Sequence, residues 1–169
     1  LKTYGIDPAE NLHPISSKEH DVICDYFTDK YTYHYKSKNL DIINAQNVFA
    51  HNSYPLDFLK QCREIMHDNT VLSIQTSQAE MIKNNEFDTI YHEHLSFFCA
   101  NSMNELAKRA GLYLIDIRKT PIHGNSYVFV FSKSPRGSTA GSMTWDCTRS
   151  WFSLSSSAFS RPCFSRAAW

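Results

Sequence analysis

Short apolar runs alternate with helix-compatible or polar segments along the first 134 residues, and this alternation restricts the fold more than any other feature. Four of these runs have the length and composition of β-strands, at residues 1–6, 22–24, 40–45 and 70–75. Segments with helical character lie between them, at residues 9–18 and 55–66. Strands that alternate with helical or loop segments are typical of βαβ units. We therefore predict an α/β fold built on a mostly parallel, Rossmann-like sheet.

The next part of the chain predicts a different ending for this sheet. Asn101 or Ser102 can cap a helix that runs to residues 109–110 and is terminated by Gly111. Residues 112–117 and 126–131 are strand-like, and a turn at 121–125 separates them. This order of helix, strand, turn and strand predicts an antiparallel end to the sheet.

The composition changes abruptly near residue 135. All lysines lie at or before Lys133, whereas residues 135–169 contain all three tryptophans and no Val, Ile, Tyr or Lys. We interpret 135–169 as a non-native, irregular or disordered tail; a natural Ser-rich linker is the alternative, which suits the tryptophans poorly. The expected domains are 1–83, a partial cofactor-binding domain, 84–134, a catalytic segment with the start of a substrate domain, and the tail.

Length and charge exclude several functions. The chain of 169 residues is long enough for one domain, and its 17 basic and 17 acidic residues balance, so nothing indicates a nucleic-acid or membrane partner. No signal-peptide pattern or initiator Met is present, and we expect the chain to begin within a longer cytoplasmic protein. The five cysteines form no CxxC pair and are expected to be free thiols.

One segment concentrates chemically active side chains, at Tyr91-His92-Glu93-His94. An imidazole titrates near neutrality, a neighbouring carboxylate can raise its basicity, and a phenol can stabilise an oxyanion. General-base catalysis on a carbon acid is one interpretation. A metal site using His92 and His94, with a distant third ligand such as His51 or His123, is another. A solvated polar turn and satisfied, partly buried histidines also remain open.

Polar side chains also follow three successive predicted strands. Asp7 follows the first, Asp25 the second, and Asn47 and His51 the third. Ligands of open α/β sheets bind outside the carboxyl ends of the strands, so this repetition predicts a binding site there. Taken alone, an Asp before a Pro, as at Asp7, is more often only a turn.

Five segments, in order, resemble one known family. They are Gly5-Ile6-Asp7-Pro8, residues 21–27 (DVICDYF), residues 47–51 (NVFAH), residues 84–98 (NNEFDTIYHEHLSFF) and residues 121–126 (PIHGNS). Residues 1–133 thereby resemble the S-adenosylmethionine-dependent C-methyltransferases that act on nucleotide-linked keto-deoxysugars.

The resemblance implies a mechanism and a set of site residues. The family removes a proton beside a keto group and then methylates that carbon, with the residue that matches His94 as general base. Tyr91, Glu93 and His51 would support catalysis. The remaining roles fall on two groups: Asp7, Asp25, Tyr26, Phe27 and Asn47 would bind the cofactor, and His123, Gly124, Asn125 and Ser126 would bind the nucleotide-linked sugar.

The chain also departs from the family pattern. The glycine-rich loop and the zinc-binding cysteine cluster that should precede Leu1 are missing, as is a further α/β domain after Lys133. Asn125 replaces the second glycine of HGGS, and residues 76–78 replace a prolyl-tyrosine. We therefore expect a fragment that binds S-adenosylmethionine weakly. A non-catalytic Rossmann-like remnant and a metal-dependent enzyme using His92 and His94 are the alternatives.

Overall fold

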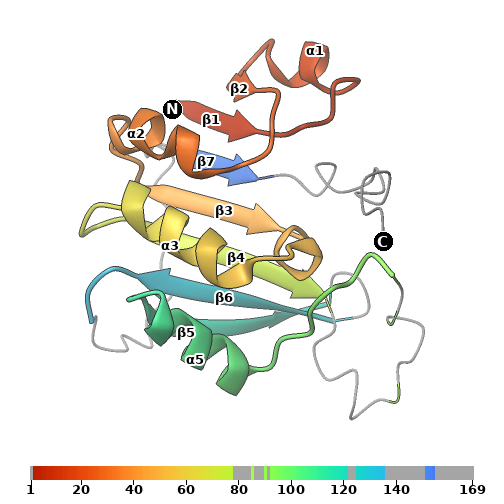
Figure 1. Ribbon diagram of the computed structural model, residues 1–169, viewed down its shortest axis with the longest axis vertical. Helices are drawn as coiled ribbons and strands as arrows, with labels where there is room; N and C mark the ends of the chain where they lie inside the picture. The colour runs from red at the N-terminus through yellow and green to blue at the C-terminus, as the bar shows by residue number, and fades with distance from the viewer. Residues whose placement is uncertain are drawn as a thin grey trace, which may run out of the picture.

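A twisted mixed sheet organises the computed structural model, which describes residues 2–76, 85, 90, 92–121 and 125–135, and the backbone of 77 and 151–154 (Figure 1). The strands run in the order β2-β1-β7-β3-β4-β6-β5. Their bounds are β1 Thr3–Ile6, β2 Asp21–Ile23, β3 Ile42–Gln46, β4 Val71–Ser77, β5 Tyr113–Thr120, β6 Ser126–Ser132 and β7 Trp151–Leu154. The first five strands in this order pair in parallel, and β6 pairs antiparallel with both β4 and β5. The predicted fold class, including its antiparallel ending, is confirmed.

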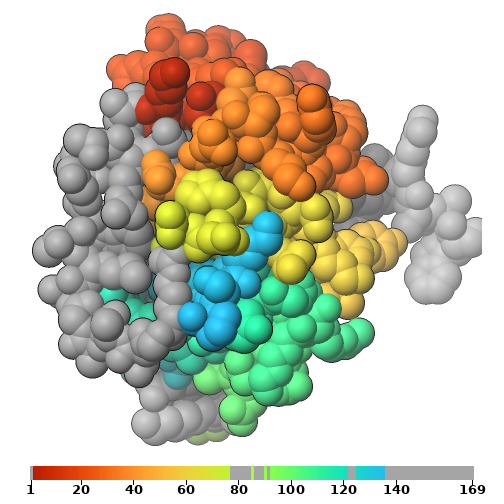
Figure 2. Space-filling view, turned by 90° about the vertical axis from the view of Figure 1, so that its left-hand side faces the viewer, coloured from red at the N-terminus to blue at the C-terminus, as the bar shows by residue number. Residues whose placement is uncertain are grey.

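The alternation of side chains along β4 explains how the sheet acquires its core. Leu72 and Ile74 lie on one face of β4 and are fully buried in the main hydrophobic cluster, with Phe129 and Phe131 of the neighbouring β6. In Figure 1 the helices α2, α3 and α5 all cover this face of the sheet. The β2 end and the β5–β6 hairpin lie at opposite ends of the molecule in the space-filling view (Figure 2). The core therefore extends across the sheet on one side, beneath α3.

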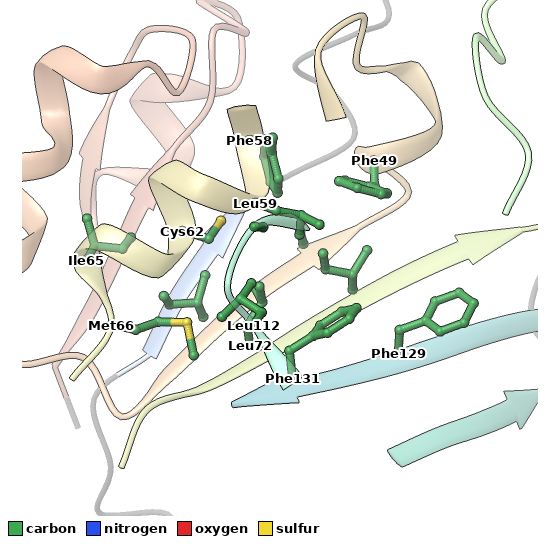
Figure 3. Packing of buried hydrophobic residues seen from close by; sticks show 14 of the residues in the cluster. Phe49, Phe58, Leu59, Cys62, Ile65, Met66, Leu72, Leu112, Phe129 and Phe131 are labelled. Carbon is green, nitrogen blue, oxygen red and sulfur yellow. The ribbon is translucent and has the colours of Figure 1, made fainter. Parts of the chain in front are cut away.

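Helix α3, Pro55–Ile65, is the main element that closes this core. Pro55 stands at the first turn, where its fixed φ suits a helix and its missing N–H is not needed. Phe58, Leu59, Cys62 and Ile65 recur at helical spacing and are buried against the sheet (Figure 3). Complete burial of each large apolar side chain contributes about 1.5–3 kcal/mol before entropy is counted, so this face fixes α3 on the sheet.

Helix α5, Ala100–Arg109, is capped at Cys99, before either of the predicted caps, Asn101 and Ser102. Cys99 is the N-cap residue, and its backbone N–H donates to Ser102 Oγ at 3.0 Å. Ser102 thus contributes to the cap from inside the first turn, and Asn101 is a helical residue. At the other end Gly111 has φ +73°, as predicted for a terminating glycine.

Two other local predictions were wrong. The helix expected over residues 9–18 is confined to α1, His13–Ser16, which has no buried residue to stabilise a longer helix. The sequence reading also missed η1, Asp29–Tyr31, and α2, Thr32–Lys36. Tyr35 anchors α2, because its ring is buried and its hydroxyl donates to the Gly5 carbonyl at 2.9 Å.

Four residues of the tail that was predicted to be irregular, Trp151–Leu154, form strand β7. It pairs in parallel with β1 on one side, matching Ile6 to Leu154, and with β3 on the other, matching Ala45 to Leu154. Doubly wound sheets place the first strand of the chain at this central position. Here β7, the last of the described strands, holds it instead. The domain boundaries stay a prediction.

Across the described parts of the chain, no helix is long and apolar enough to cross a membrane.

Candidate active site

The parallel strands bring the predicted polar side chains to one edge of the sheet. Asp7 follows the last residue of β1, Asp25 lies two residues beyond β2, and Asn47 directly follows β3. The backbone ties these strand ends together, because Asp7 N donates to Ile23 O at 3.0 Å and Asn47 N to Gln75 O at 3.1 Å. This is the edge at which open α/β sheets bind ligands.

The structure brings two of the four predicted catalytic residues into direct contact. His51 lies at the end of η2, Phe49–His51, which follows β3, and His94 lies in the irregular stretch before α5. Their ring centroids are 4.8 Å apart with an interplanar angle of 42°. Both residues are half-buried, a position in which an imidazole can meet a ligand and still be shielded from bulk water.

Main-chain hydrogen bonds hold these two imidazoles together. The His51 Nδ1–H donates to the carbonyl of Glu93 at 2.7 Å, since a carbonyl oxygen can only accept. The N–H groups of Leu95 and Ser96 both donate to the Ala50 carbonyl, at 2.9 and 3.1 Å. The residues on both sides of His94 are therefore bonded to η2.

Aromatic contacts support the same junction. The rings of Phe49 and Phe98 lie 4.8 Å apart, and Phe49 is fully buried in the core. His94 also meets Phe97 edge to face, with centroids 6.1 Å apart. Because Phe49 packs against Phe58 of α3 as well, the position of η2 is fixed by the main core.

The structure says less about the other residues of the segment 91–94. His92 and Glu93 are exposed, and only the main chain of Glu93 enters the contacts with η2. Tyr91, His123 and Gly124 lie outside the described residues. Within the described ranges, no group of three or more His, Cys, Asp or Glu side chains is arranged to hold a metal ion.

Asp7 and Asn47 were predicted to bind the cofactor. Asp7 Oδ1 accepts the N–H of Ala9 at 2.9 Å, which is the turn expected of an Asp before a Pro. Asn47 adopts φ +53°, and its buried Oδ1 has no hydrogen-bond partner within the part of the chain that the structure describes. Buried acceptors are normally satisfied, so a ligand donor at this strand end would complete Asn47.

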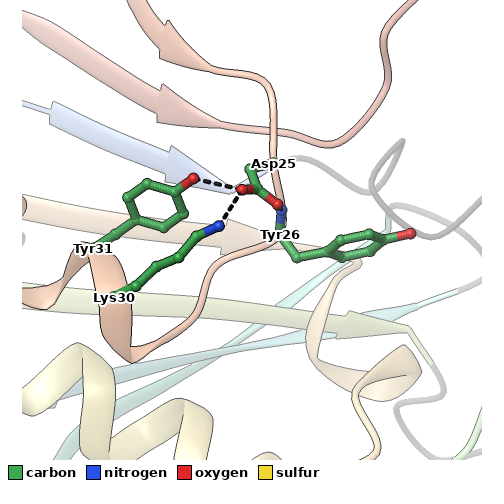
Figure 4. A network of polar contacts seen from close by, with 4 residues as sticks. All are labelled: Asp25, Tyr26, Lys30 and Tyr31. Atoms are coloured by element: carbon green, nitrogen blue, oxygen red, sulfur yellow. Dashed lines mark hydrogen bonds and ion pairs between the residues drawn. The ribbon is translucent and has the colours of Figure 1, made fainter.

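Asp25 is already engaged in a network (Figure 4). Its Oδ2 accepts from Lys30 Nζ and from the Tyr31 hydroxyl, both at 2.5 Å, and its Oδ1 accepts the Tyr26 N–H at 2.7 Å. The hydrogen bond from Lys30, followed by those from Tyr31 and Tyr26, lowers the pKa of Asp25 to about 2. A ligand amino group at Asp25 would have to share this carboxylate.

The two aromatic residues after Asp25 differ in position. Phe27 meets Phe58 of α3 edge to face at 5.7 Å and packs against the core. Tyr26 is exposed, and Figure 4 shows its ring directed away from the Lys30 and Tyr31 side chains. Of the two, Tyr26 is therefore the more exposed.

The predicted substrate-binding turn is described only at its end. Asn125 has φ +98°, in the region that favours glycine, which explains why a glycine suits this position in the resembling family. Ser126 is buried at the start of β6 and pairs with Ser77 and Thr120.

Sequence reasoning missed three residues at this edge. Lys30 and Tyr31 could have been suspected only because a cation and a phenol follow Asp25 at short range. Thr76 ends the buried part of β4, is 1% exposed, and its Oγ1 has no partner among the described residues. Nothing in the sequence distinguishes it from a solvated strand end.

Together these features define a strand-end site with a held imidazole pair, a lowered-pKa carboxylate and an unsatisfied buried acceptor. Comparison with known proteins identifies the family of the chain. The profile described as "Methyltransferase domain" matches residues 1–117. The chain belongs to this methyltransferase domain family.

The relatives of this methyltransferase domain are distant. C-methyltransferase NovU of Streptomyces niveus is 27% identical over 131 residues, which cover 75% of the chain and 31% of NovU. The chain thus spans about a third of the length of this relative. Members of the methyltransferase domain family to which the chain belongs depend on S-adenosylmethionine.

Solved structures show the same fold. CalO1, a methyltransferase of calicheamicin biosynthesis in its SAH-bound form, has a TM-score of 0.56 at 14% identity, over 79% of this chain and 42% of CalO1. A possible histamine N-methyltransferase of Thermotoga maritima has a TM-score of 0.57 at 14% identity, over 78% of this chain and 73% of its own.

Proposed function

We propose that this methyltransferase domain belongs to an enzyme that transfers a methyl group from S-adenosylmethionine to the carbon beside the keto group of a nucleotide-linked deoxysugar. The contact between His51 and His94 carries the proposal. Methylation of a carbon beside a keto group needs a base that removes a proton, and an imidazole can be that base. Membership of the methyltransferase domain family does not by itself identify such a base. The name of NovU supports carbon as the methyl acceptor.

The residues present fit S-adenosylmethionine in part. Asp7 and Asn47 follow the carboxyl ends of β1 and β3, the two strands that flank β7 in the sheet. Among the described residues the buried Asn47 Oδ1 has no hydrogen-bond partner, so it is suited to a donor group of a ligand. When bound, the cofactor supplies an electrophilic methyl group. Tyr26 is exposed beside Asp25 and would stack on an aromatic ring there.

The protein's own chemistry is the removal of a proton. His94 takes the proton from the carbon beside the keto group, and the C–H electron pair becomes an enolate. The enolate carbon would then accept the methyl group as the methyl–sulfur bond of the cofactor breaks, with that bond's electron pair staying on the sulfur. The proton would stay on the His94 imidazole until solvent removes it. Tyr91 and Glu93 are proposed to orient the sugar and its developing oxyanion, with His51 beside the base. Asn125 and Ser126, with His123 and Gly124, are proposed to bind the nucleotide-linked sugar.

Deuterium exchange tests the base directly. A nucleotide-linked keto-deoxysugar in D₂O should lose its α-proton to solvent in the presence of the protein, as followed by proton NMR. His94→Gln should reduce this exchange by about 10²–10⁴-fold, the usual contribution of general-base catalysis. His67→Gln is the control, since His67 lies in the turn before β4 and accepts a hydrogen bond from the Asn69 N–H. Exchange that survives in His94→Gln would remove His94 as the base.

A non-catalytic remnant would bind ligand and exchange no proton in the same assay. The metal-dependent alternative would require a stoichiometric metal, which elemental analysis of the purified protein measures. A cytoplasmic location remains part of the proposal.

A further inference from the structure

We propose that His51 is a positioning residue that holds the proposed base His94 in place, and that it does so only as the Nδ1–H tautomer. The inference rests on the proposed function for the identity of the base. It concerns a role that the family resemblance does not assign, since that resemblance only puts His51 in the same site.

The first observation is the hydrogen bond between His51 and Glu93. A neutral imidazole has one N–H, and the Glu93 carbonyl 2.7 Å from Nδ1 requires that N–H to be on Nδ1. Nε2 is then the unprotonated nitrogen of His51. This assignment does not depend on what else the ring contacts.

The second observation is that Glu93 immediately precedes His94, while Leu95 immediately follows it. The Glu93 carbonyl is bonded to the His51 side chain, and the Leu95 N–H to the carbonyl of Ala50, the residue before His51. Both peptide groups that flank the Cα of His94 are thereby bonded to η2. Because φ and ψ at His94 are restrained from both sides, the direction of its Cα–Cβ bond is set by η2.

The third observation is the contact between the rings. The His51 and His94 centroids are 4.8 Å apart, and Phe97 lies at 6.1 Å from His94. The His94 imidazole therefore contacts two other rings, those of His51 and Phe97, and these contacts restrict the rotation of the His94 side chain. A base placed to about an ångström matters, because such a displacement can reduce a rate by about 10²-fold.

Other histidines of the same chain provide internal controls for the tautomer. His13 Nε2 lies 3.1 Å from the Val22 carbonyl, so His13 must be the Nε2–H tautomer. His67 Nδ1 accepts the Asn69 N–H at 3.1 Å, so the neutral ring of His67 carries its proton on Nε2 as well. Only His51 among these three is held as Nδ1–H.

The first test is nitrogen NMR of the ring nitrogens in the unmodified protein at about pH 8.5, above the ordinary titration range of histidine. We expect His51 to show the Nδ1–H pattern, and His13 and His67 to show the Nε2–H pattern. An Nε2–H pattern for His51 would overturn the proposal. The measurement needs neither substrate nor cofactor.

The second test separates the donor from the ring. His51→Asn keeps an amide N–H at the distance of Nδ1 from Cβ, His51→Gln moves it one bond further, and His51→Phe keeps a ring without a donor. We expect His51→Asn to retain most of the α-proton exchange rate, and the other two to lose about tenfold or more, with the loss in kcat rather than KM. The ring signals of His94 should shift in the same two variants.

Equal loss in all three variants, or no loss in His51→Phe, would overturn the proposal. Absence of exchange in the unmodified protein would instead refute the proposed function, and the tautomer would still decide the role of His51. The two failures are therefore distinguishable.

Discussion

Two buried threonines in the same strand region are predicted to respond in opposite directions to the same substitution. Thr70→Val and Thr76→Val each replace a hydroxyl by a methyl group of nearly equal volume, so neither creates a cavity. Thr70 and Thr76 are 0% and 1% exposed, so transfer from water contributes similarly to both. What differs is the hydrogen bonding of the two hydroxyls.

The Thr70 hydroxyl is fully used. It donates to the Leu40 carbonyl at 2.6 Å and accepts the His67 N–H at 2.9 Å. Thr70→Val removes both bonds and leaves a buried carbonyl without this donor. Because an unsatisfied buried group costs about 1–3 kcal/mol, we expect a loss of about 2 kcal/mol in the free energy of unfolding.

The Thr76 hydroxyl has no partner among the residues that the structure describes, so Thr76→Val removes an unsatisfied group and none of the described hydrogen bonds. We expect a gain of about 1 kcal/mol in the free energy of unfolding. For a chain of this size 1 kcal/mol changes Tm by about 2–4 °C. The two variants should therefore lie on opposite sides of the unmodified protein, separated by roughly 6–12 °C.

Urea unfolding followed by circular dichroism measures both changes, and equal m-values would show that the unfolded states are comparable. A loss of stability in Thr76→Val similar to that of Thr70→Val would refute the reasoning, because it would mean that the Thr76 hydroxyl has a partner such as an ordered water. A gain of stability in Thr76→Val would show that the buried Thr76 hydroxyl lowers the free energy of unfolding.

Three further predictions follow from single contacts. Lys30→Met removes the largest influence on Asp25, so the carboxyl pKa should rise from about 2 towards 3.8, as carbon NMR titration would show; an unchanged midpoint would contradict the network. Gly111→Ala should reduce stability by about 1–2 kcal/mol in urea unfolding, because φ is +73° and the new Cβ would lie 2.9 Å from Arg63 Nε; a neutral effect would contradict this. Ending the chain at residue 135 should increase amide hydrogen exchange in β1 more than in the β5–β6 hairpin, since β7 pairs with β1 on the side facing β3; equal exchange would argue against β7 as the central strand.

The strands were predictable because each carries its own signal. Residues 71–77 and 126–132 alternate or accumulate β-branched and aromatic side chains, and the structure extends both predicted strands by only a residue or two. Short helices carry no such signal. The five residues of α2 are too few to show a helical period. The helix is held by the hydrogen bond from the Tyr35 hydroxyl to the Gly5 carbonyl of β1, a contact between residues far apart in the sequence that only the folded chain reveals.

The same distinction explains the candidate site. The residue types of the central segment indicated proton chemistry, but His51 and Glu93 are 42 positions apart, and no local pattern predicts their hydrogen bond. The lowered pKa of Asp25 likewise depends on how η1 turns Lys30 back towards β2. The sequence therefore proposes candidate reacting groups, which stay a prediction, and the fold shows which residues contact them.

Strand β7 shows where composition alone misleads. The change in residue usage at 135 predicts a tail distinct from the rest of the chain, yet sheet pairing depends on backbone groups that every residue except proline carries in full. Trp151–Leu154 contains β-branched or aromatic residues at its first two positions and no proline, which is sufficient for a strand if two edges are available. In this structure β1 and β3 provide those edges, each pairing with four residues of β7. At the carboxyl end of β7, Leu154 pairs with Ile6 of β1 and with Ala45 of β3. Ile6 directly precedes Asp7, and Ala45 lies two residues before Asn47. A segment set apart by composition thus pairs with the two strands that end directly before Asp7 and Asn47, and the truncation at residue 135 tests its contribution to that part of the sheet.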